Sequence, residues 1–63
     1  MFSATLRRLR EAAGLTQLAL AKKAHVPQGY ISALEAGAKR NPSVAVAKRL
    51  AKALGVPVAE LLE

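Results

Sequence analysis

The chain contains no cysteine and no tryptophan, and its only aromatic residues are Phe2 and Tyr30. Without cysteine it can form neither a disulfide nor a thiolate metal site, which fits a reducing compartment. No apolar run approaches the length of a membrane span, and no secretory leader is recognisable. We therefore expect the 63 residues to form one small domain with a core of Leu, Val, Ile and Ala.

Acidic residues are also scarce, since four Asp and Glu stand against ten Lys and Arg, for a net charge of +6. Two of the acids are Glu60 and Glu63, so residues 1–59 carry ten positive and two negative charges, a balance of +8. A small domain this basic favours a polyanionic partner, with solubility alone as the alternative. There is no acid pair, cysteine nucleophile, second histidine or glycine-rich phosphate loop. The sequence thus predicts no enzymatic activity, no metal site and no cofactor.

Apolar spacing and capping residues predict an all-α protein with five helices, at about 3–13, 17–24, 28–36, 44–54 and 58–62. Three residues have the chemistry of N-caps: Ser3, Thr16 and Ser43. Three glycines are placed to end helices: Gly14, Gly37 and Gly55. The side chains expected in the core are Phe2, Leu6, Leu9, Ala13, Leu15, Leu20, Ala21, Ala24, Ile31, Leu34, Val44, Ala47, Leu50, Ala51, Leu54, Leu61 and Leu62. This pattern predicts a compact five-helix bundle.

Residues 17–34 form the stretch around which the chain is organised, because they predict two short helices joined by a tight turn. Ala21 permits close approach of the crossing helices. Pro27 disfavours helix at Val26, and His25 occupies a turn position that often requires a positive φ. This is the helix-turn-helix pattern. The outward face of its second helix is small and polar, which suits insertion into a groove: Gln28, Gly29, Ser32 and Ala33.

Two places along the chain combine free helix N–H groups with polar or basic side chains. Gln17 lies in the first turn of the second helix and can bind a phosphate, with an exposed polar residue as the alternative. The loop 38–42 carries Lys39 and Arg40 just before the Ser43 N-cap, so it is a candidate clamp on a phosphate backbone or else a solvated basic loop. The other cations on the second and fourth helices are expected to be solvated: Lys22, Lys23, Lys48, Arg49 and Lys52.

Several single residues carry separate expectations. Glu35 lies beside the buried face of the third helix, and we expect Arg10 to pair with it in a structural ion pair. Tyr30 either donates a hydrogen bond to a phosphate or only packs. Leu18 faces outward, where it is incidental or part of a contact surface. The apolar cluster Val56–Val58 is either an edge of the core or a dimer contact.

Over about residues 3–62 the chain resembles the Cro/C1-type (XRE-family) helix-turn-helix domain, similar to that of lambdoid phage repressors. The resemblance is carried by Arg10, Gly14-Leu15-Thr16-Gln17, Leu20-Ala21, Val26, Ile31-Ser32, Leu34-Glu35, Gly37, Pro42-Ser43 and Leu50-Ala51-Lys52-Ala53-Leu54-Gly55-Val56. It implies a five-helix bundle that binds double-stranded operator DNA, commonly as a two-fold homodimer, and regulates transcription. Such a protein would be cytoplasmic and associated with the nucleoid, with neither a membrane nor a small molecule as partner.

The resemblance also implies roles for individual positions. Gln17 would contact a phosphate, and Val56–Val58 would lie near the dimer contact. The residues facing the major groove would be Gln28, Gly29, Ser32 and Ala33, and those holding the DNA backbone would be Lys39, Arg40 and Asn41. Arg10 and Glu35 would be a buried pair.

The chain departs from the family pattern at three positions. His25 replaces the usual turn glycine, at a cost of ~1 kcal/mol. Gly29 and Ala33 replace longer side chains, so base reading should rest on Gln28, whose bidentate contact to adenine contributes ~1–3 kcal/mol of discrimination. Remaining specificity would come from dimer symmetry and DNA shape. The alternative hypothesis is a protein-interaction module with little DNA affinity, for which Leu18 and Val56–Val58 are the best support.

Overall fold

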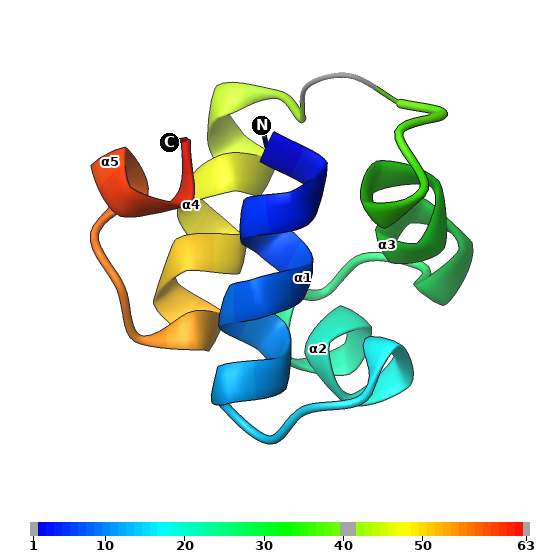
Figure 1. Ribbon diagram of the computed structural model, residues 1–63, viewed down its shortest axis with the longest axis horizontal. Helices are drawn as coiled ribbons and strands as arrows, with labels where there is room; N and C mark the ends of the chain where they lie inside the picture. Colours follow the sequence, from blue (N-terminus) through cyan, green and yellow to red (C-terminus); the bar gives the residue numbers. More distant parts are fainter. Residues whose placement is uncertain (1, 40–41, 63) are drawn as a thin grey trace.

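The computed structural model describes residues 2–39 and 42–62. Its elements are the helices α1 (Phe2–Ala12), α2 (Gln17–Ala24), α3 (Gln28–Glu35), α4 (Val44–Leu54) and α5 (Val58–Leu61) (Figure 1). The predicted all-helical bundle is confirmed. The bounds of α2 and α4 are those predicted from the sequence, and the other three helices differ by one residue at one or both ends.

Side-chain caps and left-handed residues set most of the helix ends. The Thr16 hydroxyl accepts a hydrogen bond from the Ala19 N–H at 3.0 Å, and the Ser43 hydroxyl accepts one from the Val46 N–H at 3.2 Å. Both predicted caps are therefore confirmed. The prediction that Ser3 caps the first helix is wrong, because α1 already includes Phe2 and places Ser3 within its first turn. The three helix-ending glycines all have positive φ: Gly14, Gly37 and Gly55.

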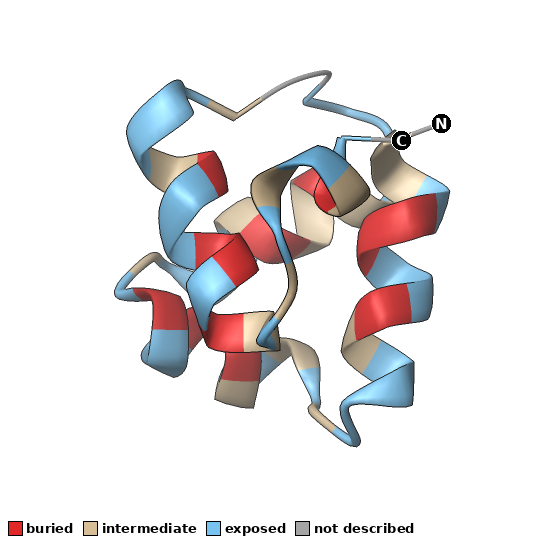
Figure 2. Cartoon of the chain, turned by 90° about the vertical axis from the view of Figure 1, so that its left-hand side faces the viewer, coloured by how far each residue is buried: buried red, intermediate tan, exposed pale blue. Residues whose placement is uncertain are grey.

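The core is a cluster of leucine, isoleucine and alanine contributed by all five helices (Figure 2). Six large side chains are fully buried: Leu6, Leu20, Ile31, Leu34, Leu50 and Leu61. The valines lie at its edge rather than inside: Val26, Val46, Val56 and Val58. Thr5 and Ala53 are buried although neither was predicted to be.

Three residues expected in the core are exposed, each at a helix end. Val44 is 73% exposed because it is the first residue of α4, one turn before that helix reaches the bundle. Leu62 is 54% exposed because α5 ends at Leu61. Ala13 is exposed because α1 ends at Ala12 and the chain turns there. For Ala13 and Leu62 the predicted helix was one residue too long, whereas Val44 is helical as predicted but lies at the exposed start of its helix.

Each of the five helices packs against at least two others, and α4 also packs against α5. α2 packs against α3 and α4, while α1 packs against α3 and α5. Ala21, 2% exposed, is among the buried residues of α2, as its small size predicted. In Figure 1, α3 and α5 lie on opposite sides of the molecule, with α1 between them. The surface around α3 is thus remote from the C-terminal helix.

His25 ends α2 in the left-handed conformation, with φ 59° and ψ 46°, as predicted for this turn. Since left-handed backbone costs an L-residue ~1–2 kcal/mol and costs glycine little, His25→Gly should raise the free energy of unfolding by ~1 kcal/mol. Thermal denaturation should then show a midpoint higher by about 4–8 °C. His25→Ala is the matched control, because it removes the imidazole and keeps the strain. Equal midpoints for the two variants would contradict this interpretation.

Candidate nucleic-acid interface

A tight turn joins α2 to α3. The His25 N–H donates to the Lys22 carbonyl at 3.3 Å, and the Val26 N–H donates to the Ala21 carbonyl at 2.9 Å, so two of the last four carbonyls of α2 have hydrogen-bond donors in the turn. Pro27 follows in an extended conformation as the N-cap of α3, without a side-chain capping bond. The first N–H groups of α3 therefore lack a side-chain partner, as anion-binding helix ends do.

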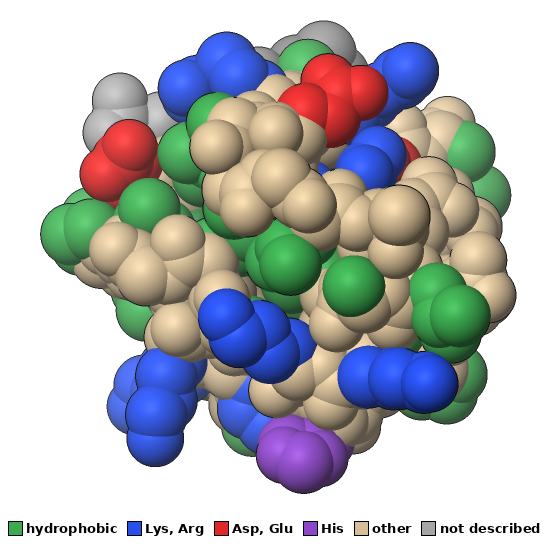
Figure 3. Space-filling view, turned by 90° about the horizontal axis from the view of Figure 1, so that it is seen from below, with side chains coloured by type: hydrophobic (Ala, Val, Ile, Leu, Met, Phe, Trp, Pro, Cys, Tyr) green, Lys and Arg blue, Asp and Glu red, His purple; other side chains and the backbone are tan. Residues whose placement is uncertain are grey.

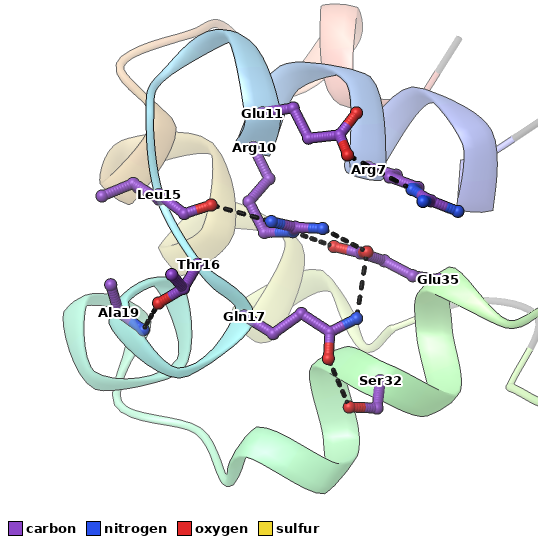
Figure 4. Close-up of polar contacts among 9 residues, drawn as sticks. All are labelled: Arg7, Arg10, Glu11, Leu15, Thr16, Gln17, Ala19, Ser32 and Glu35. Carbon is purple, nitrogen blue, oxygen red and sulfur yellow. Dashed lines mark hydrogen bonds and ion pairs between the residues drawn. The ribbon is translucent and has the colours of Figure 1, made fainter.

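The Arg10–Glu35 pair connects α1 to the end of α3 (Figure 4). Arg10 Nε and Nη2 donate to the two Glu35 carboxylate oxygens at 2.6 and 3.0 Å. Arg10 Nη1 donates to the Leu15 carbonyl at 2.8 Å. The side chains of Arg10 and Glu35 are only 12% and 4% exposed, so the pair is largely shielded from solvent. The geometry agrees with the predicted structural role of this pair.

Gln17 extends this pair into a network that the sequence did not reveal (Figure 4). Its amide nitrogen donates to Glu35 Oε1 at 3.2 Å, and its amide oxygen accepts from the Ser32 hydroxyl at 2.7 Å. Ser32 and Glu35 are three residues apart on α3, so both can reach one side chain at the start of α2. The only hint in the sequence was that helical spacing. The network fixes α3 against both α1 and α2.

The network also determines the protonation of its charged members. Burial alone would raise the pKa of Glu35, but hydrogen bonds from Arg10 and Gln17, together with the positive charges of Arg10 and Arg7, outweigh burial and lower it. The Glu35 hydrogen bond raises the pKa of Arg10 above its already high value, against the opposing effect of burial. Both residues are therefore held in their charged forms.

The predicted groove-facing residues lie on one face of α3 with unequal exposure. Gln28 and Gly29 are exposed in its first turn, whereas Ser32 and Ala33 are half-buried. Because the Ser32 hydroxyl donates its proton to Gln17, it can only accept a hydrogen bond from a partner outside the protein. The Gln17 amide likewise retains one N–H for a phosphate, since the other donates to Glu35.

A basic side chain is held beside this face. Lys39 Nζ lies 5.3 Å from the centroid of the Tyr30 ring, within cation–π range. Tyr30 itself is half-buried and packs against the core, so packing is part of its role. The other two residues predicted to hold the backbone, Arg40 and Asn41, lie outside the described residues.

The remaining predicted contact residues occupy other surfaces. Val56 and Val58 pack against the core, while Pro57 is exposed. These valines therefore form a core edge, and a dimer contact at this cluster stays a prediction. Leu18 is 47% exposed on α2, facing outward as expected.

Two other kinds of feature are absent from residues 2–39 and 42–62. No group of three or more His, Cys, Asp and Glu side chains lies close enough to hold a metal ion there. In the same part of the chain, none of the helices has the length and apolar character needed to cross a membrane.

Comparison with known proteins agrees with this geometry. The family model described as helix-turn-helix matches residues 6–61. The uncharacterized HTH-type transcriptional regulator y4dJ of Sinorhizobium fredii is 46% identical over 55 residues, which are 87% of this chain and 70% of that protein. The crystal structure of SinR, the master regulator for biofilm formation, in complex with DNA has a TM-score of 0.96 and 30% identity over all of both chains.

A second solved structure is also similar to this chain over most of its length. The restriction-modification controller protein C.AhdI from Aeromonas hydrophila has a TM-score of 0.89 and 38% identity, covering 95% of this chain and 89% of that one. The fold and the α2–turn–α3 unit define a helix-turn-helix domain. The chain belongs to this family, in its Cro/C1-type (XRE) branch, and is a DNA-binding domain of the kind that regulates transcription.

Proposed function

We propose that α3 enters the major groove of double-stranded operator DNA with its N-terminal turn foremost, as in other helix-turn-helix regulators. Base edges would be met by Gln28, Gly29, Ser32 and Ala33. The observation that carries this proposal is the asymmetry of α3. Its inner side is tied to Arg10 of α1 and Gln17 of α2 through Glu35, while its outer side presents small or uncharged residues beside Lys39.

Gly29 supports a close approach of DNA to this helix. It is exposed, its φ is not positive, and a Cβ built on it would meet no atom within 4 Å. Nothing inside the described structure thus requires glycine, although glycine in a helix costs ~1 kcal/mol relative to alanine. A partner that approaches the backbone closely would exclude a side chain there.

The protein would make two kinds of contact with DNA, to phosphates and to bases. Phosphates would be held by Gln17, by the N–H groups at the start of α2 and α3, and by residues 39–41. These phosphate contacts together would supply the salt-dependent affinity. Bases would be read mainly by Gln28, because Gly29 has no side chain and Ala33 offers only a methyl group to a thymine methyl. We infer modest base readout by one protomer, supplemented by DNA shape.

A two-fold dimer would supply the remaining specificity. On this proposal residues 1–63 act as one DNA-binding unit, and Val56–Val58 lie near the dyad on the α5 side. Two half-sites about one helical turn apart would then be expected in the operator. Selection from random duplexes would show them. On the same proposal the chain acts on chromosomal DNA in the cytoplasm. Selected sequences without repeated half-sites would contradict the dimer.

Gln28→Ala tests the base reading directly. Loss of a bidentate adenine contact should weaken binding to a selected duplex by ~1–3 kcal/mol, about 5- to 150-fold, with little effect on a random duplex. Fluorescence anisotropy with both duplexes at one salt concentration measures the two affinities. Lys39→Gln is the control, because loss of a phosphate contact should weaken both duplexes alike and reduce the salt dependence. An equal loss on both duplexes for Gln28→Ala would exclude base reading by Gln28.

Exposed apolar side chains favour the second candidate function, a protein-interaction module. Leu18, Val44 and Leu62 are 47%, 73% and 54% exposed. A mobility shift at low salt separates the two functions, because a module devoted to a protein partner would not respond to duplex DNA.

A further inference from the structure

A basic depression of about 390 Å³ lies where α2 and α4 end side by side. Its lining comes from the end of α2 and the second half of α4: Lys23, His25, Arg49, Lys52 and Ala53. Figure 3 shows the histidine in purple with lysine and arginine side chains in blue around it, while the acidic side chains in red lie toward other edges of this view. Among residues 2–39 and 42–62, the lining thus contains three permanent cations and no carboxylate.

The three lining cations have no ion pair among the residues that the structure describes. The pairs found there are Arg7–Glu11 and Arg10–Glu35, whose residues belong to α1 and α3, and neither helix lines the depression. Three cations that line one depression repel one another, and an anion bound in the depression would relieve that repulsion. The described structure offers no such anion of its own.

Stabilisation of helix ends explains only part of this cluster. Lys23 and Lys52 lie in the last turns of α2 and α4, where a cation interacts favourably with the helix dipole. Arg49 lies one turn earlier on α4, yet it lines the same depression. Lys22 is in the last turn of α2 and does not line it. Position near a helix end therefore does not determine which cations converge.

The depression is also distinct from the surface proposed to bind the operator. Gln17 is at the opposite end of α2, about 10 Å away along the helix axis at 1.5 Å per residue. Lys39 precedes the start of α4, whereas the lining residues of α4 are in its last two turns. No residue of α3 lines the depression.

We propose that this depression binds consecutive phosphate groups. Lysine, arginine and imidazole N–H groups on two sides of a cavity suit a ligand with several anionic oxygens in a row. Such a ligand is either a free phosphorylated molecule with a phosphate chain or the backbone of nucleic acid that extends beyond the operator contact. The depression is a second anion site, and it does not depend on how α3 reads DNA.

The test uses inorganic tripolyphosphate as the free ligand and a long duplex as the nucleic acid. The variant Lys23→Gln/Arg49→Gln removes two lining cations. The matched control Lys22→Gln/Lys48→Gln removes two exposed cations from the same two helices, next to the lining residues. Backbone amide shifts in NMR follow the tripolyphosphate titration, and circular dichroism confirms that all proteins are folded.

A free phosphorylated ligand is indicated if tripolyphosphate shifts the amides of His25 and Ala53 and the lining variant weakens this binding about fivefold or more, with less than a twofold change in the control. A nucleic-acid ligand is indicated if the lining variant weakens only the long duplex, again by more than the control does. Equal effects of the two variants in both titrations, or no effect in either, would overturn the proposal. Gln28→Ala should leave tripolyphosphate binding unchanged, so failure of this site and failure of the proposed DNA contact are distinguishable.

Discussion

Glu35→Gln is expected to lower the free energy of unfolding by about 3 kcal/mol, because it leaves the guanidinium of Arg10 shielded from water without a counter-charge. The substitution keeps the shape of the side chain, so the loss reports on charge rather than on packing. A domain of this size has a total stability near 5 kcal/mol, and the midpoint of thermal unfolding should fall by about 12 °C or more. Urea and thermal denaturation followed by circular dichroism measure both quantities.

The exposed Arg7–Glu11 ion pair provides the matched control for Glu35→Gln. Glu11 accepts from Arg7 at 3.5 Å, and both side chains are more than half exposed. Glu11→Gln should therefore change stability by less than about 0.5 kcal/mol. The double variant Arg10→Met/Glu35→Leu should be more stable than Glu35→Gln, since no unpaired charge remains. A similar loss for Glu35→Gln and Glu11→Gln would show that the Arg10–Glu35 pair is not effectively buried.

The pH dependence follows from the lowered pKa of Glu35. A carboxyl whose folded pKa is below its unfolded value of about 4.3 contributes stability above that pH, and the contribution is lost as pH falls through the folded pKa. The difference in free energy of unfolding between the wild-type protein and Glu35→Gln should thus be largest at pH 7 and decrease below a pH of about 4. A difference that stays constant across this range would contradict the assignment of the lowered pKa.

Gly29→Glu is expected to abolish operator binding while leaving the fold intact. The position is exposed and helical, with no neighbour within 4 Å of the new Cβ, so the side chain fits the free protein. Against DNA the same side chain brings a carboxylate toward phosphates and bases. Like-charge juxtaposition of this kind costs several kcal/mol, and a loss of ~3 kcal/mol would weaken binding more than 100-fold. Anisotropy titrations with the selected duplex measure the change.

Two variants separate charge from bulk and from position. Gly29→Gln has the same shape without the charge and should lose less affinity than Gly29→Glu. Ala59→Glu adds the same charge on α5, on the opposite side of the molecule from α3 (Figure 1). It should change little the affinity for a duplex with a single half-site, which one protomer binds without the proposed dimer contact. If Gly29→Glu binds as tightly as Ala59→Glu, α3 does not face the groove.

Helix positions could be predicted from the sequence because capping and breaking residues act locally. Thr16 and Ser43 accept bonds from backbone three residues on, and Pro27 and His25 shape the turn without help from distant residues. The Arg10–Glu35 pair joins residues 25 positions apart, yet it was predictable because Glu35 adjoins the buried face and few acids compete for a partner. The prediction of burial was wrong for residues at helix ends, as Val44 and Leu62 show. Burial there depends on where the neighbouring helices stop.

The parts of the site that sequence reasoning missed all require knowledge of helix packing. Gln17 was assigned to an outside phosphate, and the structure shows its amide also bonded to Glu35 and Ser32. Lys23, Arg49 and Lys52 are exposed, as predicted, but the sequence did not reveal that they line one depression between the ends of α2 and α4. Periodicity identifies the face on which a side chain lies, and only the crossing of helices determines which faces meet.

The hydrogen bonds of Glu35 and Ser32 point toward α1 and α2, so the orientation of α3 is fixed from within the molecule. Gln28 and Gly29, by contrast, have no part in that arrangement and lie in the open. These two positions can therefore be exchanged for other amino acids without refolding the scaffold. A combinatorial library at Gln28 should therefore yield variants that prefer other operators and keep the same architecture, whereas a side chain at Gly29 would hold the helix backbone away from the DNA.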